Sequence, residues 1–242
     1  MPHPLYRPAP ILPGDEDRVQ YLRSLNILDT KEEASFDRIT EAASTILQTP
    51  IALVSLVDKD RQWFKSKVGV DVCETSRDLA FCSHAIIQPD ERPFIIDDAL
   101  EDERFKYSDP VLGEPHVRFY AGAPLVLTAD DGTSYKIGTL CVIDKTPRKL
   151  EQEQILLMET LARLVVAEIE LRDRLAGLHE KQISQVQEGA QVTNTFPFGL
   201  SAAGFRNTPS SAGMGTADAH LLHWPGSRPA YPMPTLCYQP SA

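Results

Sequence analysis

The sequence predicts an α+β fold with an antiparallel sheet. The strand-like runs 117–127 and 135–144 are rich in β-branched and aromatic residues, which suit a pleated surface. Asp131-Gly132 between them readily adopts the positive φ of a hairpin turn. A second strand pair is indicated earlier in the chain, and helical patterns stand at both ends of the folded part. With 42% hydrophobic residues among 242, the chain can build a packed core.

The chain begins with two predicted helices. The first 14 residues are proline-rich and are expected to be irregular. A helix is predicted over 18–28, because acidic residues precede it and apolar residues recur every three positions. A second helix is predicted over 32–47 from its single apolar stripe, and Pro50 follows it.

The first strand pair follows these helices. Residues 51–57 form a near-continuous apolar run, which is typical of a central strand covered on both faces. Residues 61–67 have mixed polarity and are interpreted as the adjacent strand. Because successive side chains of a strand point to opposite faces, Trp63 and Phe64 should each reach a different face.

The middle of the chain is less regular. Residues 68–78 read as a loop, 79–87 as a short helix and 93–98 as a short strand. The charged connection 99–116, called the lid below, exceeds the length of about 12 residues beyond which connections in compact domains are often functional.

The hairpin after the lid contains Gly122, Pro124 and Gly138. Glycine within a strand usually marks a bulge or the close approach of another group, and proline marks an edge or a bulge. We therefore interpret the hairpin as the floor of a pocket.

A long helix is predicted from about residue 150 to residue 187 and carries two apolar stripes. One stripe can cover the sheet, which leaves the other for a partner helix. Because the second stripe outlasts the first, we expect the helix to leave the domain and to pair with its twin in a parallel homodimer. The first stripe consists of Ile155, Met158, Ala162, Val165 and Ile169, and the second of Leu157, Leu161, Leu164, Leu171, Leu175 and Leu178.

Composition limits the partners. Residues 189–242 contain three charged residues, seven prolines and six glycines, so they are expected to form a disordered tail. The formal net charge of the chain is −10, which disfavours nucleic acid as a partner because phosphate binding needs a basic face.

No apolar run reaches the roughly 18 residues needed to cross a bilayer, and the first residues lack the apolar core of a signal peptide. We expect a cytoplasmic protein with no membrane partner.

The four cysteines, Cys73, Cys82, Cys141 and Cys237, lie far apart in the sequence. A cytosolic chain with an ample core neither needs nor favours a disulfide framework. We expect all four to be thiols.

Six sequence motifs occur in an order that closely resembles the GAF domains at the sensory ends of histidine kinases and diguanylate cyclases. The motifs are LDT (28–30), IALVSLVD (51–58), RQWFK (61–65), FCSHAI (81–86), RFYAGAPL (118–125) and GTLCVID (138–144). The resemblance implies an antiparallel sheet of about five or six strands, with helices on one face and a ligand pocket on the other. The expected parts are an irregular segment 1–14, a GAF domain 15–175, a helix extension 176–188 and the tail 189–242.

The resemblance implies a regulatory sensor without catalytic activity of its own. GAF domains hold cyclic nucleotides, linear tetrapyrroles, haem or small metabolites, and some only dimerise, so the cofactor stays unidentified. The expected partners are a second copy of the chain, a small-molecule ligand, and a signalling kinase or cyclase, since no output motif is found in this sequence. Two alternatives remain open: a reductase of free methionine sulfoxide, and a ligand-free structural dimerisation module.

Cys82 and His84 form the most chemically suggestive pair. A helix places them about 200° apart, so they do not easily share one metal ion, even with Cys73 and His116 as further ligands. GAF domains that attach bilins have a cysteine followed directly by histidine, and the one-residue gap here departs from that pattern. For His84 a structural role is favoured over haem ligation.

Two other chemistries use neighbouring residues. Ser83, His84 and Asp97 could form a hydrolytic triad, but no nucleophile elbow flanks the serine. A thiol reductase would use cysteines among Cys73, Cys82 and Cys141, but Cys141 lies on a strand within an apolar run, and a buried apolar cysteine has a raised pKa and poor reactivity. The structural interpretation of the cysteines is therefore favoured.

Arg118 and Tyr120 share one face of their strand. They could hold a small anionic or polar metabolite beneath the lid. We favour an alternative in which Arg118 pairs with Asp97, Asp98 or Glu114 and holds the lid shut. No catalytic or metal residue is assigned. The candidate ligand-binding residues are Trp63, Cys82, His84, Asp97, Arg104, Arg118 and Tyr120.

Overall fold

The computed structural model describes residues 5–192, with side chains placed as far as His179. The chain divides into two compact units, and the fold described below belongs to the unit that contains residues 5–179. The expected disordered tail lies outside the described residues from 193 onward, whereas 189–192 form the end of the last helix.

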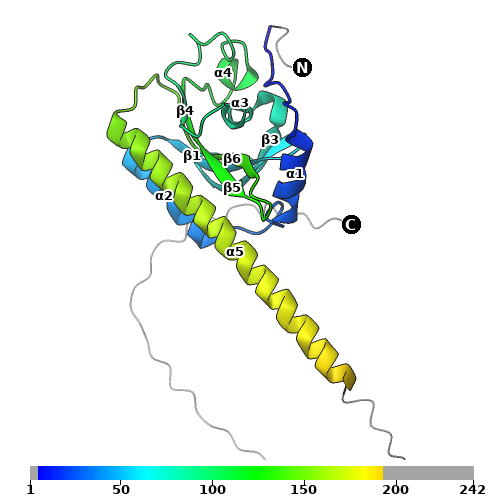
Figure 1. Cartoon of the computed structure of the whole chain (residues 1–242). Helices are drawn as coiled ribbons and strands as arrows, with labels where there is room; N and C mark the ends of the chain where they lie inside the picture. Colours follow the sequence, from blue (N-terminus) through cyan, green and yellow to red (C-terminus); the bar gives the residue numbers. More distant parts are fainter. Residues whose placement is uncertain (1–4, 193–242) are drawn as a thin grey trace, which may run out of the picture. The chain divides into compact units, whose positions relative to one another are not determined.

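Six strands form one antiparallel sheet in the order β3-β2-β1-β6-β5-β4 (Figure 1). The predicted α+β class with five or six strands is confirmed. The strands are β1 (Ile51–Val57), β2 (Arg61–Val68), β3 (Glu74–Ser76), β4 (Phe94–Ile96), β5 (Phe119–Thr128) and β6 (Ser134–Asp144). The helices are α1 (Asp15–Ser24), α2 (Ala34–Leu47), the 3₁₀ turn η1 (Arg77–Leu79), α3 (Phe81–Ile86), α4 (Asp109–Leu112) and α5 (Gln152–Val192).

Two hairpins make the centre of the sheet. β1 pairs with β2 on one side and with β6 on the other, and β5 pairs with β6 along its whole length. β1 has the predicted bounds, because its continuous apolar run is buried on both faces. The hairpin predicted over 117–144 is confirmed.

Three local predictions differ from the structure. α1 begins at Asp15, three residues early, because acidic residues in its first turn suit the positive end of the helix dipole. It ends at Ser24, and Asn26 adopts a left-handed conformation with φ 48. The predicted loop 68–78 contains the edge strand β3, and the lid contains α4.

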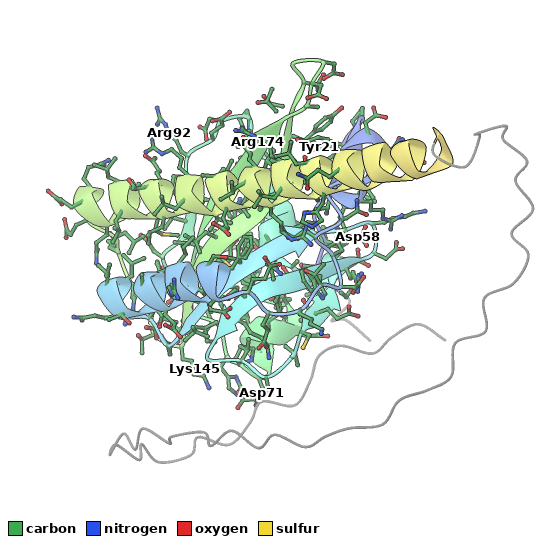
Figure 2. The ribbon with its side chains drawn as sticks, turned by 90° about the horizontal axis from the view of Figure 1, so that it is seen from below. Tyr21, Asp58, Asp71, Arg92, Lys145 and Arg174 are labelled. Carbon is green, nitrogen blue, oxygen red and sulfur yellow. The ribbon has the colours of Figure 1, made fainter. Side chains whose placement is uncertain are left out.

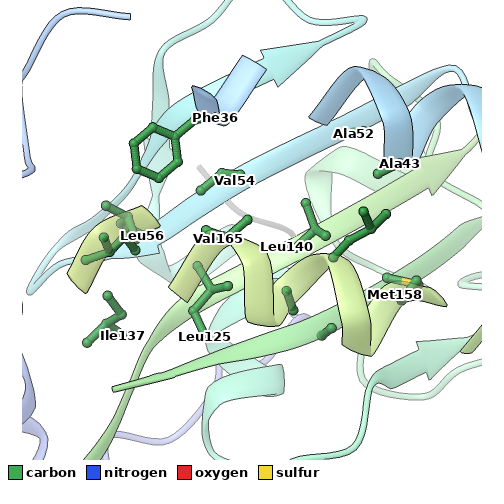
Figure 3. Packing of buried hydrophobic residues seen from close by; sticks show 14 of the residues in the cluster. Phe36, Ala43, Ala52, Val54, Leu56, Leu125, Ile137, Leu140, Met158 and Val165 are labelled. Carbon is green, nitrogen blue, oxygen red and sulfur yellow. The ribbon is translucent and has the colours of Figure 1, made fainter. Parts of the chain in front are cut away.

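The two faces of the sheet carry separate apolar cores. α2 and α5 lie side by side over one face, with the end of α1, and α3 and the lid cover the other (Figures 1 and 2). We call these the helix-side core, part of which is drawn in Figure 3, and the lid-side core. The helix-side core includes Phe36, Ala43, Val54, Leu56, Leu125, Ile137, Leu140, Met158 and Val165. The lid-side core includes Phe64, Phe81, Cys82, Phe94, Phe105, Tyr120 and Cys141.

Glycines in the hairpin mark close approaches, as predicted. A Cβ atom on Gly138 would lie 2.0 Å from the backbone oxygen of Ser55. A Cβ atom on Gly122 would lie 2.1 Å from the hydroxyl of Tyr120. Pro124 lies beyond the part of β5 that pairs with β4 and stands opposite Thr139 of β6.

α5 presents two apolar faces. Four of the five residues of the first predicted stripe are buried in the helix-side core, up to Ile169. The second stripe is partly wrong, because Leu157 and Leu161 also pack in that core. Its other four leucines are exposed, with 51–58% of their surface accessible. We call these four the leucine face: Leu164, Leu171, Leu175 and Leu178.

Candidate functional site

Three of the predicted site residues meet in the lid-side core. Cys82 and His84 come from α3, and Tyr120 comes from β5. Trp63 does not join them, because it packs in the helix-side core while its neighbour Phe64 points to the lid side. The predicted alternation of these two residues is confirmed, but Trp63 lies on the wrong face of the sheet to contact anything under the lid.

The sulfur of Cys82 is surrounded by hydrogen-bonding groups. The Tyr120 hydroxyl donates to it at 3.4 Å and the Thr139 hydroxyl at 3.2 Å. The sulfur of Cys141 lies 3.9 Å away. Both cysteines are free and buried. The site therefore places a buried sulfur atom between two hydroxyl donors and a second thiol.

This arrangement follows from the alternation of two neighbouring strands. Thr139 and Cys141 are two residues apart on β6, so both point to the lid side. Gly122 lies opposite Cys141 on β5, and its missing side chain leaves space for the Tyr120 hydroxyl. Sequence reasoning missed Thr139, although its spacing from Cys141 would have indicated it.

The two thiols have opposite acid–base properties. A hydrogen bond from Cys141 and others from nearby hydroxyls lower the pKa of Cys82 to about 6, although burial opposes the shift. The pKa of Cys141 is raised well above its usual value by its hydrogen bond to Cys82 and by burial. The raised pKa expected of a buried apolar cysteine thus fits Cys141, whereas hydrogen bonds from Cys141 and from nearby hydroxyls lower the pKa of Cys82 despite its burial.

His84 is buried beside this thiol site. Burial, and then the charge of Arg104, lower its pKa to about 4, so the imidazole is neutral at pH 7. Its ring stands edge-on to Phe105 at 4.7 Å between centroids. Within the described residues its Nε2 atom has no hydrogen-bond partner.

The lid fills the space that the sequence predicted to be a pocket. Phe105 is fully buried and stacks on Phe81 with 4.1 Å between ring centroids. Arg104 lies over the rings of Phe94 and Phe105 and forms an ion pair with Asp102 at 2.6 Å. The expected open pocket between lid and hairpin is therefore occupied by the lid's own side chains.

Arg118, which follows the lid in the sequence, pairs with Asp98, which precedes it. Its Nε and Nη2 atoms donate to the two carboxylate oxygens of Asp98 at 2.7 and 2.5 Å. The predicted pairing of Arg118 with one of three acids is confirmed for Asp98.

The predicted site residue Asp97 has an exposed side chain. Its main-chain oxygen accepts a hydrogen bond from the backbone N–H of Arg148.

Two charged residues of the RQWFK motif have structural roles. Lys65 is buried, and its Nζ atom donates to Thr30, to the Lys31 carbonyl and to Glu33 at 2.5–2.9 Å. Arg61 forms two hydrogen bonds with the carboxylate of Asp29. These contacts tie β2 to the segment between α1 and α2, so the LDT motif is a docking point for β2.

A cavity of about 440 Å³ lies on the opposite side of the sheet from the lid site, beside α5. It has an apolar floor of small residues and a charged rim, of which Arg92 is labelled in Figure 2. The floor is formed by Ala123, Pro124, Val126, Ala162 and Val166, and the rim by Asp90, Glu91, Arg92, Glu159 and Arg163. Sequence reasoning missed this cavity because loop, strand and helix meet only in the fold.

Among the described residues, no three His, Cys, Asp or Glu side chains come together as metal ligands. Cys73 is disulfide-bonded, which corrects the expectation that every cysteine is a thiol. In the described part of the chain, no helix combines the length and apolar character needed to cross a bilayer.

Comparisons with known proteins agree with this architecture. Over 163 residues the chain is 42% identical to a cyclic di-GMP phosphodiesterase of Pseudomonas aeruginosa, and the match covers 66% of this chain but only 27% of that protein. The GAF domain of an Acinetobacter phosphoenolpyruvate-protein phosphotransferase is 16% identical with a TM-score of 0.46, covering 66% of this chain and 95% of that one. A free methionine-R-sulfoxide reductase of Neisseria meningitidis is 15% identical with a TM-score of 0.43, covering 67% and 90%. The family model of the GAF domain matches residues 32–169, which is more than half of the chain. The chain belongs to the GAF domain family.

Proposed function

We propose that the protein is a non-catalytic sensory or regulatory domain that signals through α5 and works as a homodimer. The observation that carries this proposal is the leucine face. The core face of α5 ends at Ile169, whereas exposed leucines continue to Leu178. The first apolar face of α5 already covers the sheet. A second, exposed apolar face lowers the solubility of the protein unless another surface buries it.

The spacing of the leucine face suits a helix partner. From Leu164 to Leu171 there are seven positions, and Leu175 and Leu178 follow after four and three. This heptad spacing keeps the four side chains on one seam of two helices that wind around each other. A second copy of α5 in parallel offers the matching seam.

β5 provides the connection from the lid site to α5. Tyr120 points into the lid-side core, whereas Phe119 and Ala121 on the same strand point into the helix-side core with α5. A change of packing under the lid would therefore move side chains that contact the helix.

The dimer is tested by substituting the leucine face. Leu171→Lys with Leu175→Lys should halve the mass that light scattering measures for the full chain, because two buried charges cannot share an apolar seam. Leu112→Lys is the matched control, since Leu112 on α4 is 50% exposed and Leu171 is 51% exposed. A wild-type chain that runs as a monomer at micromolar concentration would contradict the proposal.

A small ligand is the second part of this proposal, and its site is the space that Phe105 occupies beneath the lid. The buried, unpaired Nε2 atom of His84 supports it, because a ligand donor would satisfy that nitrogen. Arg104 and Arg118 already have carboxylate partners, so neither offers a free charge to the ligand. Trp63 is left out of the proposed site.

Ligand binding is tested by thermal shift and native mass spectrometry on the full chain. The probes are haemin, biliverdin, cyclic nucleotides and a library of small polar metabolites. A ligand at 100 times its Kd should stabilise the fold by about 2.7 kcal/mol and raise its melting temperature. No bound species and no shift with any probe would favour a ligand-free dimerisation module.

A signalling partner completes the proposal. The similarity to the cyclic di-GMP phosphodiesterase supports a role beside a cyclase, a phosphodiesterase or a kinase. The lowered pKa of Cys82 favours one second candidate, a reductase of free methionine sulfoxide. Turnover with a thiol reductant that disappears in Cys82→Ser would establish that activity, and no turnover would end it.

A further inference from the structure

The thiol pair in the lid-side core plays no part in the proposed dimer. Cys82 on α3 and Cys141 on β6 are both free, and no more than 2% of either residue is exposed. Their sulfur atoms are 3.9 Å apart, which is van der Waals contact. A disulfide needs about 2.05 Å, so the two side chains must close by roughly 1.9 Å. α3 is a short helix that lies over β6 (Figure 1).

We propose that Cys82 and Cys141 form a reversible dithiol switch, which a hydroperoxide oxidises to an internal disulfide. The geometry assigns a different role to each sulfur. Cys82 accepts hydrogen bonds from Tyr120 and Thr139, which stabilise a thiolate. Cys141 remains a thiol and is placed to attack the oxidised sulfur.

Acid–base properties support this assignment. The hydrogen bond from Cys141 and the hydroxyl donors lower the pKa of Cys82, which favours a thiolate at Cys82 over one at Cys141. The pKa of Cys141 is raised, so it keeps its proton. Cys82 is therefore the better nucleophile toward a peroxide.

The chemistry proceeds in two balanced steps. The Cys82 thiolate attacks one peroxide oxygen, the O–O bond breaks, and the leaving oxygen takes a proton from solvent, which leaves Cys82 as a sulfenic acid. The Cys141 thiol then attacks the Cys82 sulfur, the S–O bond breaks, and the hydroxyl group leaves as water with the thiol proton. With hydrogen peroxide, the two thiols and one peroxide give one disulfide and two water molecules. An external dithiol then reduces the disulfide back to the two thiols.

The oxidised pair would change the packing under the lid. A disulfide removes the thiolate to which Tyr120 and Thr139 donate, and both residues are fully buried. Their hydroxyls would lose their strongest acceptor in a place that water does not reach, which is costly. Because burial restricts access, the oxidant must be as small as a peroxide, and oxidation should be faster when the lid opens.

The experiment treats the full chain with hydrogen peroxide, blocks free thiols after denaturation, and maps the peptides by mass spectrometry. The expected product is a peptide pair joined by Cys82 and Cys141 that separates again with dithiothreitol. In Cys141→Ser, which lacks the second sulfur, Cys82 should instead be trapped as a sulfenic acid by dimedone.

A second variant separates reactivity from structure. Tyr120→Phe removes one hydrogen-bond donor to the thiolate and should slow oxidation about threefold to tenfold at pH 7. The curve of oxidation rate against pH should also move to higher pH, because the pKa of Cys82 rises. Tyr135→Phe is the control, since Tyr135 stacks on Tyr21 away from the thiols.

The proposal is overturned if both sulfurs stay reduced while free cysteine in the same tube is oxidised. A disulfide from Cys82 to any other cysteine overturns it as well. Neither outcome alters the mass of the dimer, so the proposed function is tested separately.

Discussion

Replacing Phe105 with alanine is expected to lower the free energy of unfolding by about 3–5 kcal/mol. Among the aromatic contacts of the described residues, Phe105 is the only lid side chain that contacts rings on both α3 and the sheet. These rings are Phe81 on α3 and Phe94 on β4. It is fully buried, lies 4.1 Å from Phe81 between ring centroids, and meets the edge of His84. The truncated side chain would leave a cavity whose walls, made of rigid rings, cannot collapse fully.

Urea unfolding of the full chain measures this effect. Leu112→Ala provides the control, because this leucine also lies in the lid and is half exposed, so its loss should change stability by no more than about 0.5 kcal/mol. A loss below about 1 kcal/mol for Phe105→Ala would mean that the lid packs loosely, contrary to the burial described above.

The same variant informs the ligand proposal. If the lid site is designed to exchange Phe105 for a ligand, the cavity of Phe105→Ala should bind small apolar molecules such as benzene, and these should restore part of the lost stability. Binding that is equal in the wild type and the variant would place the ligand elsewhere, for example in the cavity beside α5.

Replacing Asp15 with asparagine is expected to cost about 3–5 kcal/mol of stability at pH 7. The Asp15 carboxylate accepts hydrogen bonds from Arg77 at 2.7 and 2.8 Å and from Arg18 at 2.8 Å. The side chains of both arginines are at most 8% exposed. An amide keeps the shape of the carboxyl group but removes its charge, which leaves two nearly buried guanidinium groups without their counterion.

The effect has a defined pH dependence. Burial raises the pKa of Asp15, but hydrogen bonds from Arg77 and Arg18 and their charges outweigh it, so the pKa is lowered overall. A carboxyl group with a lowered pKa stabilises the fold fully above its unfolded pKa of about 4, and this contribution is lost as the pH falls through the folded value. The difference between wild type and Asp15→Asn should therefore shrink below about pH 4.

Asp17→Asn is the matched control for this prediction. Asp17 lies in the same first turn of α1 but is exposed, so it shares the helix-dipole contribution without the buried partners. Its substitution should cost only a few tenths of a kcal/mol. An equal loss in the two variants would show that the helix dipole, and not the arginine pair, accounts for the role of Asp15.

The regular parts of the fold could be predicted because their signals are local. β1 was predicted with its exact bounds, since a strand buried on both faces must be apolar throughout. Gly138 was recognised as a close approach, because only glycine lets the backbone of β1 come so near. β3 was missed, because three residues have no pattern of their own and become a strand only by pairing with β2.

The site depended on neighbours that are distant in the sequence. Periodicity showed that Arg118 and Tyr120 share a face and that α5 has two apolar stripes. It could not show that Phe105 fills the space under the lid, that Trp63 points away from it, or that Leu161 belongs to the core. These outcomes depend on which side chains compete for the same volume.

The sequence by itself predicted the family, the two hairpins and a long helix with a second apolar stripe. Only the tertiary structure decided the chemistry of Cys82. A cysteine in an apolar run is expected to keep its proton, and the pKa of Cys141 is indeed raised by its hydrogen bond to Cys82 and by burial. Cys82 differs because hydroxyls from two strands and a second thiol converge on its sulfur, and hydrogen bonds to a charged form are strong enough to overcome the cost of its burial.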